Sequence, residues 1–184
     1  MRVSAALLRR ARRHLARGRV IAYATESCFG LGCDLNNEHA LLQVLRLKRR
    51  PKAKGLIVIA DRAERFLGQL APLSDTEQQQ LAQTWPGPHT WLIRAASRTR
   101  RALRGQHATL AVRVTAHPYA RDLCARLGMP LVSTSANRSG LRPIKTAREC
   151  ARQFGRRVLV IPGCIGERKQ PSTIQDLSTG QILR

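Results

Sequence analysis

The segment from Leu131 to Gly140 reads Leu-Val-Ser-Thr-Ser-Ala-Asn-Arg-Ser-Gly. Its apolar start predicts a short buried strand over Leu131–Ser135, and the Asn, Ser and Gly that follow are typical of a turn. Hydroxyl and amide groups therefore gather at the end of a strand, where open α/β sheets bind their ligands. The same residues favour turns for conformational reasons alone, so this segment by itself leaves both interpretations open.

Strand-like and helix-like segments alternate on both sides of this segment. Further strands are predicted at 20–23, 56–60, 90–95, 110–114, 158–161 and 174–177. Helices are predicted at 38–48 behind a cap at Asn36 or Asn37, from Asp61 to Leu67, from the capping box at Ser74 to the residues before Trp85, from Pro118 to Gly128, and from the capping box at Thr146 to Gly155. This order predicts one domain over residues 1–184 of class α/β (α+β), a twisted mixed sheet with flanking helices.

Two segments have a less regular pattern. Residues 94–106 are the most basic and least apolar part of the chain, which predicts an exposed, mobile loop. Gly30 and Gly32 are expected to form tight turns after Tyr23, because glycine adopts backbone conformations that other residues avoid.

The first nineteen residues contain seven arginines and no acidic residue. Such a composition is typical of an organelle transit peptide, but it also fits the first helix of the domain. Ser4 can cap that helix, and Leu7, Leu8, Ala11 and Leu15 share one face of it. We favour the helix, because the strand at 20–23 follows without a spacer.

The chain of 184 residues carries 33 Lys and Arg against 11 Asp and Glu, a net charge of +22. Such a surface attracts polyanions such as nucleic acids, nucleotides or an anionic membrane. No apolar run approaches the roughly 18 residues of a transmembrane helix, so we expect no membrane span. The five cysteines are irregularly spaced, which indicates free thiols and a reducing, cytoplasmic location.

Common catalytic and cofactor motifs are missing. Leu35 stands at the third glycine position of a dinucleotide fingerprint, and no P-loop is present. The five histidines are scattered, so no protein metal site is expected. Glu26 and Asp34 are notable in a chain with few acids. Either could bind a cation or balance nearby arginines.

A basic run, Lys48-Arg-Arg-Pro-Lys-Ala-Lys-Gly55, joins a helix to a strand. Runs of this kind are usually solvated surface. This one lies between two core elements, where fixed cations could also hold phosphates. The residues alone leave both interpretations open.

Five stretches occur in a fixed order along the chain: Tyr23-Ala-Thr25-Glu26, Lys48-Arg-Arg50-Pro51, Leu110-Ala-Val-Arg113, Ser133-Thr-Ser135-Ala-Asn137-Arg-Ser-Gly140 and Pro171-Ser-Thr-Ile174. Together with Trp85-Pro-Gly-Pro88, this combination resembles the YrdC/TsaC family of threonylcarbamoyl-AMP synthases, in its short bacterial form. The resemblance extends from Arg19 to the C-terminus.

The resemblance implies a sheet that encloses a large, positively charged cavity. It implies a nucleotidyltransferase that joins L-threonine, bicarbonate and ATP into threonylcarbamoyl-AMP and releases pyrophosphate. The product would serve the N6-threonylcarbamoyladenosine modification of tRNA, which partner proteins complete. Mg²⁺ is expected to bridge the phosphate oxygens of ATP.

The resemblance also implies roles for ten residues. The catalytic residues would be Lys48, Arg50, Ser135 and Asn137. The threonine-binding residues would be Thr25, Arg113, Ser133 and Ser172, with Arg113 gripping the carboxylate by its two-pronged guanidinium. The nucleotide-binding residues would be Lys48, Arg50, Lys54, Thr109, Ser135 and Asn137.

One residue departs from the family pattern, and two alternative functions also fit the sequence. Ala24 stands where the family usually has proline, which could loosen the turn before Thr25 or be held by the sheet. The charge of +22 also fits a non-catalytic RNA-binding factor of tRNA or rRNA maturation, although aromatic residues are only 4%. Carbamoyl-adenylate chemistry on another substrate, as in hydrogenase-maturation relatives of the same fold, is a third possibility.

Overall fold

The computed structural model describes residues 3–184. Its helices are α1 (Ala5–Ala16), α2 (Glu38–Lys48), α3 (Asp75–Ala82), α4 (Arg101–Arg104), α5 (Pro118–Leu127) and α6 (Ala147–Phe154). Its strands are β1 (Val20–Ala24), β2 (Phe29–Gly32), β3 (Ile57–Ala60), β4 (His89–Arg94), β5 (Thr109–Val114), β6 (Leu131–Ser135), β7 (Val158–Val160) and β8 (Thr173–Asp176). Three short 3-10 helices are η1 (Lys52–Lys54), η2 (Ala63–Phe66) and η3 (Gly155–Arg157).

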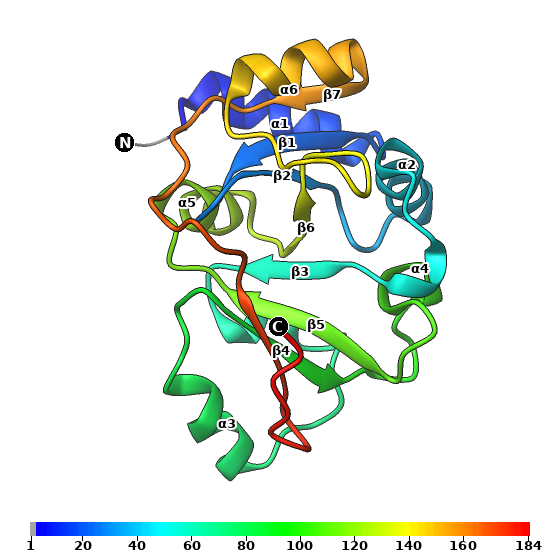
Figure 1. The fold of residues 1–184 in the computed structure, drawn as a ribbon, viewed down its shortest axis with the longest axis vertical. Helices are drawn as coiled ribbons and strands as arrows, with labels where there is room; N and C mark the ends of the chain where they lie inside the picture. Colours follow the sequence, from blue (N-terminus) through cyan, green and yellow to red (C-terminus); the bar gives the residue numbers. More distant parts are fainter. Residues whose placement is uncertain (1–2) are drawn as a thin grey trace.

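The eight strands form one mixed sheet in the order β7-β1-β2-β6-β3-β5-β4-β8. The pairs β1–β7, β3–β5 and β4–β8 are parallel, and the other pairs are antiparallel. Figure 1 shows β1 and β2 in the upper half of the molecule and β3, β5 and β4 in the lower half. Strand β6 pairs with both β2 and β3 and so joins the two halves. The predicted fold class is confirmed.

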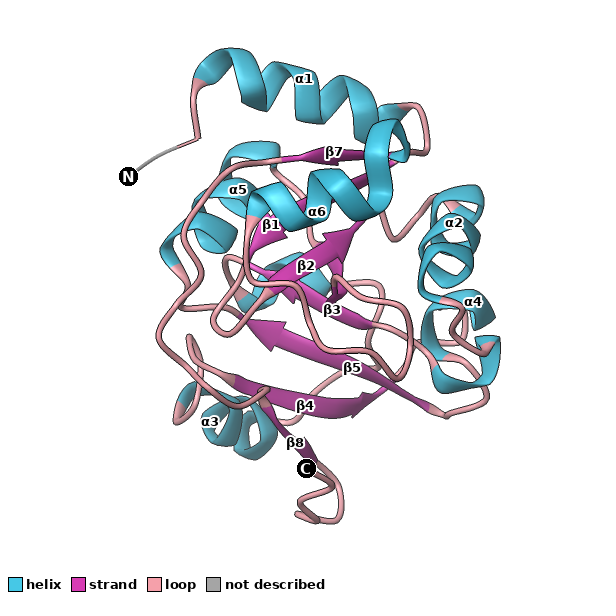
Figure 2. Ribbon diagram, turned by 45° about the horizontal axis from the view of Figure 1, so that its top comes forward, coloured by secondary structure: helices cyan, strands magenta, loops and turns pink. Residues whose placement is uncertain are grey.

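Helices cover both faces of the strands (Figure 2), and the buried side chains form two hydrophobic clusters. In β1, Ile21 and Tyr23 pack with residues of α1 and α5, whereas Val20 and Ala22 pack with residues of α2 and α6. Successive side chains of a strand point to opposite faces, so a strand covered on both sides is apolar throughout. This explains the continuous apolar run of β1.

The capping signals at Asn37, Ser74 and Thr146 are confirmed. Ser74 and Thr146 each form a capping box, with Glu77 and Glu149 respectively. Asn37 caps α2, as one of the two expected candidates. Such caps satisfy backbone N–H groups that the first helical turn leaves without a partner.

The expectation that Gly30 and Gly32 form turns is wrong, because both lie in β2, which pairs with β1 and β6. Close packing explains these glycines. A β-carbon on Gly32 would lie 2.6 Å from the Tyr23 ring and 2.6 Å from the Val132 carbonyl oxygen. This strand is hard to predict from the sequence, because its two glycines conceal the apolar alternation.

Residues 94–106 are not one exposed loop, since they include α4. Leu103 on that helix is fully buried in the core cluster, and its carbonyl accepts a hydrogen bond from the Leu56 N–H. The helix predicted from Asp61 to Leu67 is instead the 3-10 helix η2, without a side-chain cap. Asp61 pairs with Arg65 there, with 3.2 Å between the charged atoms.

The basic N-terminal segment forms α1, as favoured. Ser4 caps the helix, and Ala11 and Leu15 are buried against β1 and α5. Among residues 3–184 no helix is long and apolar enough to cross a membrane.

Candidate active site

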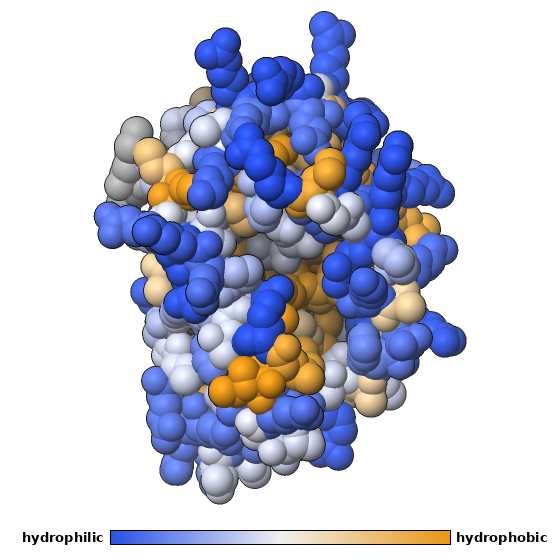
Figure 3. Space-filling model, in the orientation of Figure 1, coloured by the Kyte–Doolittle hydropathy of each residue, from blue (hydrophilic) through white to orange (hydrophobic). Residues whose placement is uncertain are grey.

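A cavity of about 570 Å³ opens between the two halves of the sheet. Figure 3 shows a hollow with hydrophilic side chains on either side and hydrophobic ones on its floor and lower rim. All ten residues singled out in the sequence line it: Thr25, Lys48, Arg50, Lys54, Thr109, Arg113, Ser133, Ser135, Asn137 and Ser172. They come from α2, η1, β5, β6 and the connecting segments. The fold therefore brings the predicted site together.

The charge of the cavity is strongly unbalanced. Six cationic side chains line it, and Glu26 is the one carboxylate among its described lining residues. The six are Lys48, Arg50, Lys54, Arg104, Arg113 and Arg184. A hollow lined by one sign of charge raises the local concentration of the opposite ion. The cavity is therefore suited to a polyanionic ligand.

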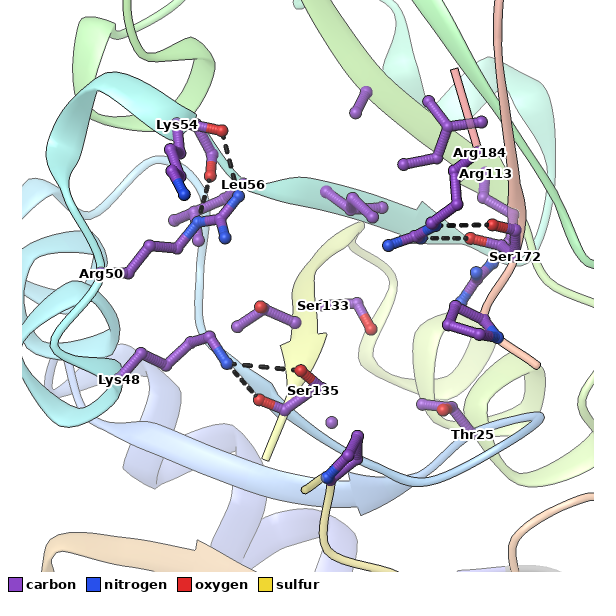
Figure 4. Close-up of a pocket in the computed structure, with 18 of the residues that line it drawn as sticks. Thr25, Lys48, Arg50, Lys54, Leu56, Arg113, Ser133, Ser135, Ser172 and Arg184 are labelled. Carbon is purple, nitrogen blue, oxygen red and sulfur yellow. Dashed lines mark hydrogen bonds between the residues drawn. The ribbon is translucent and has the colours of Figure 1, made fainter. Parts of the chain in front are cut away.

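Lys48 is the most buried of these cations, with 3% of its surface exposed. Its Nζ donates to the Ser135 carbonyl oxygen at 2.5 Å (Figure 4). It also donates to Asn137 Oδ1 at 2.9 Å and to the Asn137 carbonyl oxygen at 3.2 Å. These acceptors are neutral, so they orient the ammonium group without cancelling its charge. Burial first, and then the charge of Arg50, lower the pKa of Lys48 to about 8.

The end of α2 places Lys48 and Arg50 together. The Arg49 N–H bonds to the Arg46 carbonyl and the Arg50 N–H to the Leu45 carbonyl, which is the Schellman pattern of a helix C-terminus. Arg49 takes the left-handed position of this motif with φ of 51°, which costs an L-residue about 1–2 kcal/mol. This reversal of the chain lets Lys48 and Arg50, the residues before and after Arg49, face the same cavity.

Arg50 is held by carbonyl oxygens and has no acidic partner among the described residues. Its Nε donates to the Gly55 oxygen at 2.9 Å and its Nη2 to the Lys54 oxygen at 3.1 Å. Burial lowers its pKa, but guanidinium remains charged in proteins. Arg50 therefore presents a fixed positive charge beside Lys48.

The turn after β6 supplies the oxygens that hold Lys48. Ser135 Oγ donates to Asn137 Oδ1 at 2.7 Å, and Asn137 Nδ2 donates to the Leu141 carbonyl at 2.5 Å. The Ser139 N–H donates to the Lys48 carbonyl at 2.7 Å, which ties this turn to the end of α2. The chemical groups predicted at the strand end are thus part of a connected network.

Arg113 and Glu26 form an ion pair at the other end of the cavity. Arg113 Nη2 lies 3.1 Å from Glu26 Oε2, and Thr115 Oγ1 donates to Glu26 Oε1 at 2.7 Å. Glu26 was expected either to bind a cation or to balance a nearby arginine, and it balances Arg113. The Nε of Arg113 is buried without a hydrogen-bond partner among the described residues. A buried donor of this kind is costly unless a ligand completes it.

The turn at Thr25 is closed by two hydrogen bonds. Both the N–H and the Oγ1 of Thr25 donate to the Cys28 carbonyl, at 3.0 and 2.7 Å. Ala24 is buried and pairs with Phe29 at the end of the β1–β2 ladder. The sheet therefore holds the turn that follows Ala24.

A sequence model of the Sua5/YciO/YrdC family, described as "Telomere recombination", matches residues 13–184. The chain belongs to the Sua5/YciO/YrdC family. A threonylcarbamoyl-AMP synthase of Methylobacillus flagellatus is 56% identical over 176 residues, which are 95% of this chain and 98% of that one. A threonylcarbamoyl-AMP synthase of Chromobacterium violaceum is 53% identical and covers 97% of this chain and 92% of its own. These relatives favour the enzyme over the non-catalytic RNA-binding factor.

Solved structures of the Sua5/YciO/YrdC family have the same fold. P. abyssi Sua5 complexed with L-threonine superposes with a TM-score of 0.87 at 26% identity and covers 96% of this chain. This chain spans about half of that protein, 53% of its length. E. coli YciO superposes with a TM-score of 0.84 at 22% identity, over all of this chain and 92% of its own, which supports the fold alone.

Two arginines that line the cavity, Arg104 and Arg184, were not among the site residues predicted from the sequence. Arg184, the last residue of the chain, donates from Nε to the Ser172 carbonyl at 3.2 Å and reaches Ser172 Oγ at 3.5 Å (Figure 4). Arg104, on α4, donates to the His107 carbonyl at 2.6 Å. Neither belongs to a recognisable motif, and Arg104 lies in the segment expected to be a loop.

Residues 3–184 contain no group of three His, Cys, Asp or Glu side chains that could hold a metal ion. Glu26, the carboxylate at the cavity, is already bonded to Arg113 and Thr115. The side chains present therefore do not fit a protein-held magnesium site.

Proposed function

We propose that this chain is an L-threonylcarbamoyladenylate synthase, a nucleotidyltransferase that converts L-threonine, bicarbonate and ATP into threonylcarbamoyl-AMP, pyrophosphate and water. One observation carries the proposal. Among residues 3–184, a single cavity has a cluster of cations without acidic partners at one end and an arginine with an unsatisfied buried donor at the other. The two ends suit two different anions, a polyphosphate and an amino-acid carboxylate.

The phosphate end would consist of Lys48, Arg50 and Lys54, with Ser135, Asn137 and Thr109. Lys48 and Arg50 are oriented by neutral oxygens, so their charges remain available to the phosphates of ATP. Fixed cations placed where charge develops lower the barrier, because they need no reorganisation during the reaction. Arg184 and Arg104 would add two further charges along the same cavity.

The threonine end would consist of Arg113, Thr25, Ser133 and Ser172. Glu26 occupies one N–H group of Arg113 and leaves the buried Nε for the substrate carboxylate. Gly30 leaves room there, since a β-carbon on it would lie 3.3 Å from Ser133 Oγ and from Thr25 Cγ2. The relative crystallised with L-threonine supports threonine as the ligand, without naming the residues that bind it.

The chemical step would be an in-line attack at phosphorus. The threonine amine combines with bicarbonate to give a carbamate and water. A carbamate oxygen then bonds to the α-phosphorus of ATP, the bond to the bridging oxygen breaks, and pyrophosphate leaves. The nucleophile is an ionised carboxylate, so no general base is required. Holding two anions in line is the main task of the cavity.

Magnesium would enter as part of the substrate, bound to the phosphates of ATP. It neutralises charge on the phosphate oxygens when it is present. The protein residues described here bind the remaining charge and orient the nucleotide.

The product is a mixed anhydride, so we propose that it is passed to proteins that transfer the threonylcarbamoyl group to adenosine in tRNA. We propose the cytoplasm as the compartment. The five cysteines are free thiols, four of them buried, as is typical of proteins in a reducing environment.

Pyrophosphate release by the purified chain tests this function. Release should require ATP with Mg²⁺, bicarbonate and L-threonine together, and Lys48→Ala should lower kcat/KM by at least about 100-fold, as expected for loss of one charge-stabilising group. L-Serine in place of threonine probes the substrate class. Release without threonine, or full activity in Lys48→Ala, would refute the assignment.

A matched control separates lost chemistry from lost folding. Lys52 is exposed in η1 and does not line the cavity, so Lys52→Ala should keep wild-type turnover. Both variants should unfold cooperatively. A Lys48→Ala protein that does not fold would be replaced by Lys48→Met, which keeps the volume of the aliphatic chain.

A further inference from the structure

A second hollow, of about 110 Å³, lies on the outer side of the wall that carries Lys48 and Asn137. The C-terminal end of α2, the turn after β6 and the C-terminal end of α6 with η3 contribute to it (Figure 1). Its lining contains four arginines and no carboxylate among the described residues: Arg46, Arg49, Arg138 and Arg157, together with Leu47, Gln153 and Phe154.

The hollow and the reaction cavity lie on opposite sides of one wall. Successive residues of this wall line the cavity and the hollow in turn. Lys48 and Arg50 line the cavity, while Arg49 between them lines the hollow. Likewise Asn137 and Ser139 line the cavity, and Arg138 between them lines the hollow. The hydrogen bond from the Ser139 N–H to the Lys48 carbonyl holds the two segments together. The two arginines are therefore fixed by the same backbone that builds the active site.

The negative charge at the two helix ends does not balance the four arginines of the hollow. The C-termini of α2 and α6 each carry about half a negative charge from their aligned peptide dipoles. The four guanidinium groups carry four positive charges, so about three positive charges remain unbalanced. None of the four makes an ion pair with the described residues. The excess charge remains available to a ligand.

Arg49 is also the one non-glycine residue of the described chain with a positive φ. Glycine is the usual residue at this position of a helix end, because it carries no steric penalty there. An arginine at this place gives up backbone stability and contributes a guanidinium to the hollow. This observation is independent of the charge count.

We propose that this hollow is a second anion site that binds one phosphate group, separate from the reaction cavity. The hollow, of about 110 Å³, is large enough to admit one tetrahedral oxyanion. Several arginine forks can bond the oxygens of one phosphate. The phosphate can be free in solution or belong to an RNA backbone, and the test separates these two sources. The proposal does not depend on the reaction assigned to the cavity.

The test follows inorganic phosphate binding by the backbone amide signals of the ¹⁵N-labelled 20.5 kDa protein. Amides of Arg49 and Gln153 report on the hollow, and the amide of Ser172 reports on the reaction cavity. We expect saturable shifts at the hollow with their own Kd. Shifts that stay linear with concentration, or that are confined to the cavity, would overturn the proposal.

Variants assign the binding to these arginines. Arg46 and Arg138 make no side-chain hydrogen bond with described residues, so Arg46→Gln with Arg138→Gln should fold normally and raise the Kd at the hollow at least about tenfold. The control, Arg9→Gln with Arg10→Gln, removes the same charge from exposed positions on α1 and should change that Kd less than about twofold. Equal weakening by both pairs would show general charge attraction and overturn the proposal.

Arg49→Gly separates binding from a structural role. Glycine fits the left-handed position, so the melting temperature should stay the same or rise while phosphate binding at the hollow weakens. A fall in melting temperature with unchanged phosphate binding would show that Arg49 is structural only and would overturn the proposal.

A second titration distinguishes the sources of the phosphate. Hexauridylate without terminal phosphates provides only backbone diesters. Saturation of the Arg49 and Gln153 shifts at lower concentration by this RNA than by inorganic phosphate would support a nucleic-acid backbone site. The reverse order would support a site for free oxyanions. Failure of both ligands to saturate these signals would contradict a phosphate site of either kind.

Discussion

Lys48 Nζ donates a 2.9 Å hydrogen bond to the side-chain oxygen of Asn137, 89 positions further along the chain. The same oxygen accepts a 2.7 Å bond from Ser135 Oγ. Asn137 thus holds the ammonium group with a neutral oxygen, and the charge of Lys48 remains uncompensated. A carboxylate here would hold it as firmly but would cancel the charge.

Asn137→Asp tests this distinction. The new carboxylate would pair with Lys48 and repel phosphates, and repulsion of about 3 kcal/mol corresponds to a rise of roughly 100-fold in the KM for ATP. The ion pair would keep Lys48 bonded, but Asp lacks the Nδ2 group that donates to the Leu141 carbonyl, so the free energy of unfolding should fall by about 1–3 kcal/mol. Steady-state kinetics with varied ATP measure the effect. Asn137→Ser, which adds no charge, is the control and should be affected less than Asn137→Asp.

The pKa of Lys48, lowered by burial to about 8, predicts a pH dependence. Lysine is charged below its pKa, so the free enzyme loses this cation as the pH rises through about 8. The kcat/KM for ATP should then fall, approaching tenfold per pH unit. Bound ATP favours the charged form, so kcat should decline at a higher pH than kcat/KM.

Lys48→Arg provides the control for this profile, because guanidinium stays charged across the range. Carbamate formation from threonine is itself pH-dependent, and both proteins share that dependence. The ratio of wild-type to Lys48→Arg kcat/KM should therefore fall above pH 8. A constant ratio between pH 7 and 9.5 would argue against titration of Lys48.

The two ends of the cavity should respond to different substitutions. Arg113→Lys removes the two-pronged contact to a carboxylate and should raise the KM for threonine about 10- to 100-fold, the equivalent of roughly 1.5–3 kcal/mol. The KM for ATP should change less than about threefold. Arg50→Lys should have the opposite pattern. Equal effects of both variants on the KM values for threonine and ATP would contradict separate binding of the two substrates at the two ends of the cavity.

Two glycines of β2 predict a contrast in stability. A β-carbon on Gly32 would lie 2.6 Å from both the Tyr23 ring and the backbone oxygen of Val132, whereas one on Gly30 would lie 3.3 Å from Ser133 Oγ and Thr25 Cγ2. Gly32→Ala should lower the free energy of unfolding by about 1–3 kcal/mol. Gly30→Ala should cost less stability but raise the KM for threonine. Denaturant unfolding and kinetics compare the two.

Much of the local structure was predictable because its causes are local. The capping boxes at Ser74 and Thr146 depend on residues three positions apart, and both form as predicted. The strand at 131–135 was visible because an apolar run ends in turn residues. Strand β2 was missed, since Gly30 and Gly32 remove the side chains that reveal alternation. Helix α4 was missed because the burial of Leu103 depends on its partners, not on its basic neighbours.

The residues at the cavity were named from motifs, but the sequence could not provide their mutual arrangement. That Glu26 pairs with Arg113 follows only from the folded chain, which brings positions 87 apart into contact. Arg184 enters the cavity because the chain reverses after β8 and runs back beside it to Ser172. No local pattern marks either event.

Most strands and helices, the capping boxes at Ser74 and Thr146, and the residue types able to hold phosphate and carboxylate could be predicted from the sequence, because these depend on neighbours within a few positions. Which of those residues meet depends on the tertiary structure. The sheet places β6 between β2 and β3, and this order alone sets Asn137 beside Lys48 and turns Arg49 and Arg138 to the other side of the same wall. Contacts between distant positions depend on strand order and packing, which local periodicity does not encode.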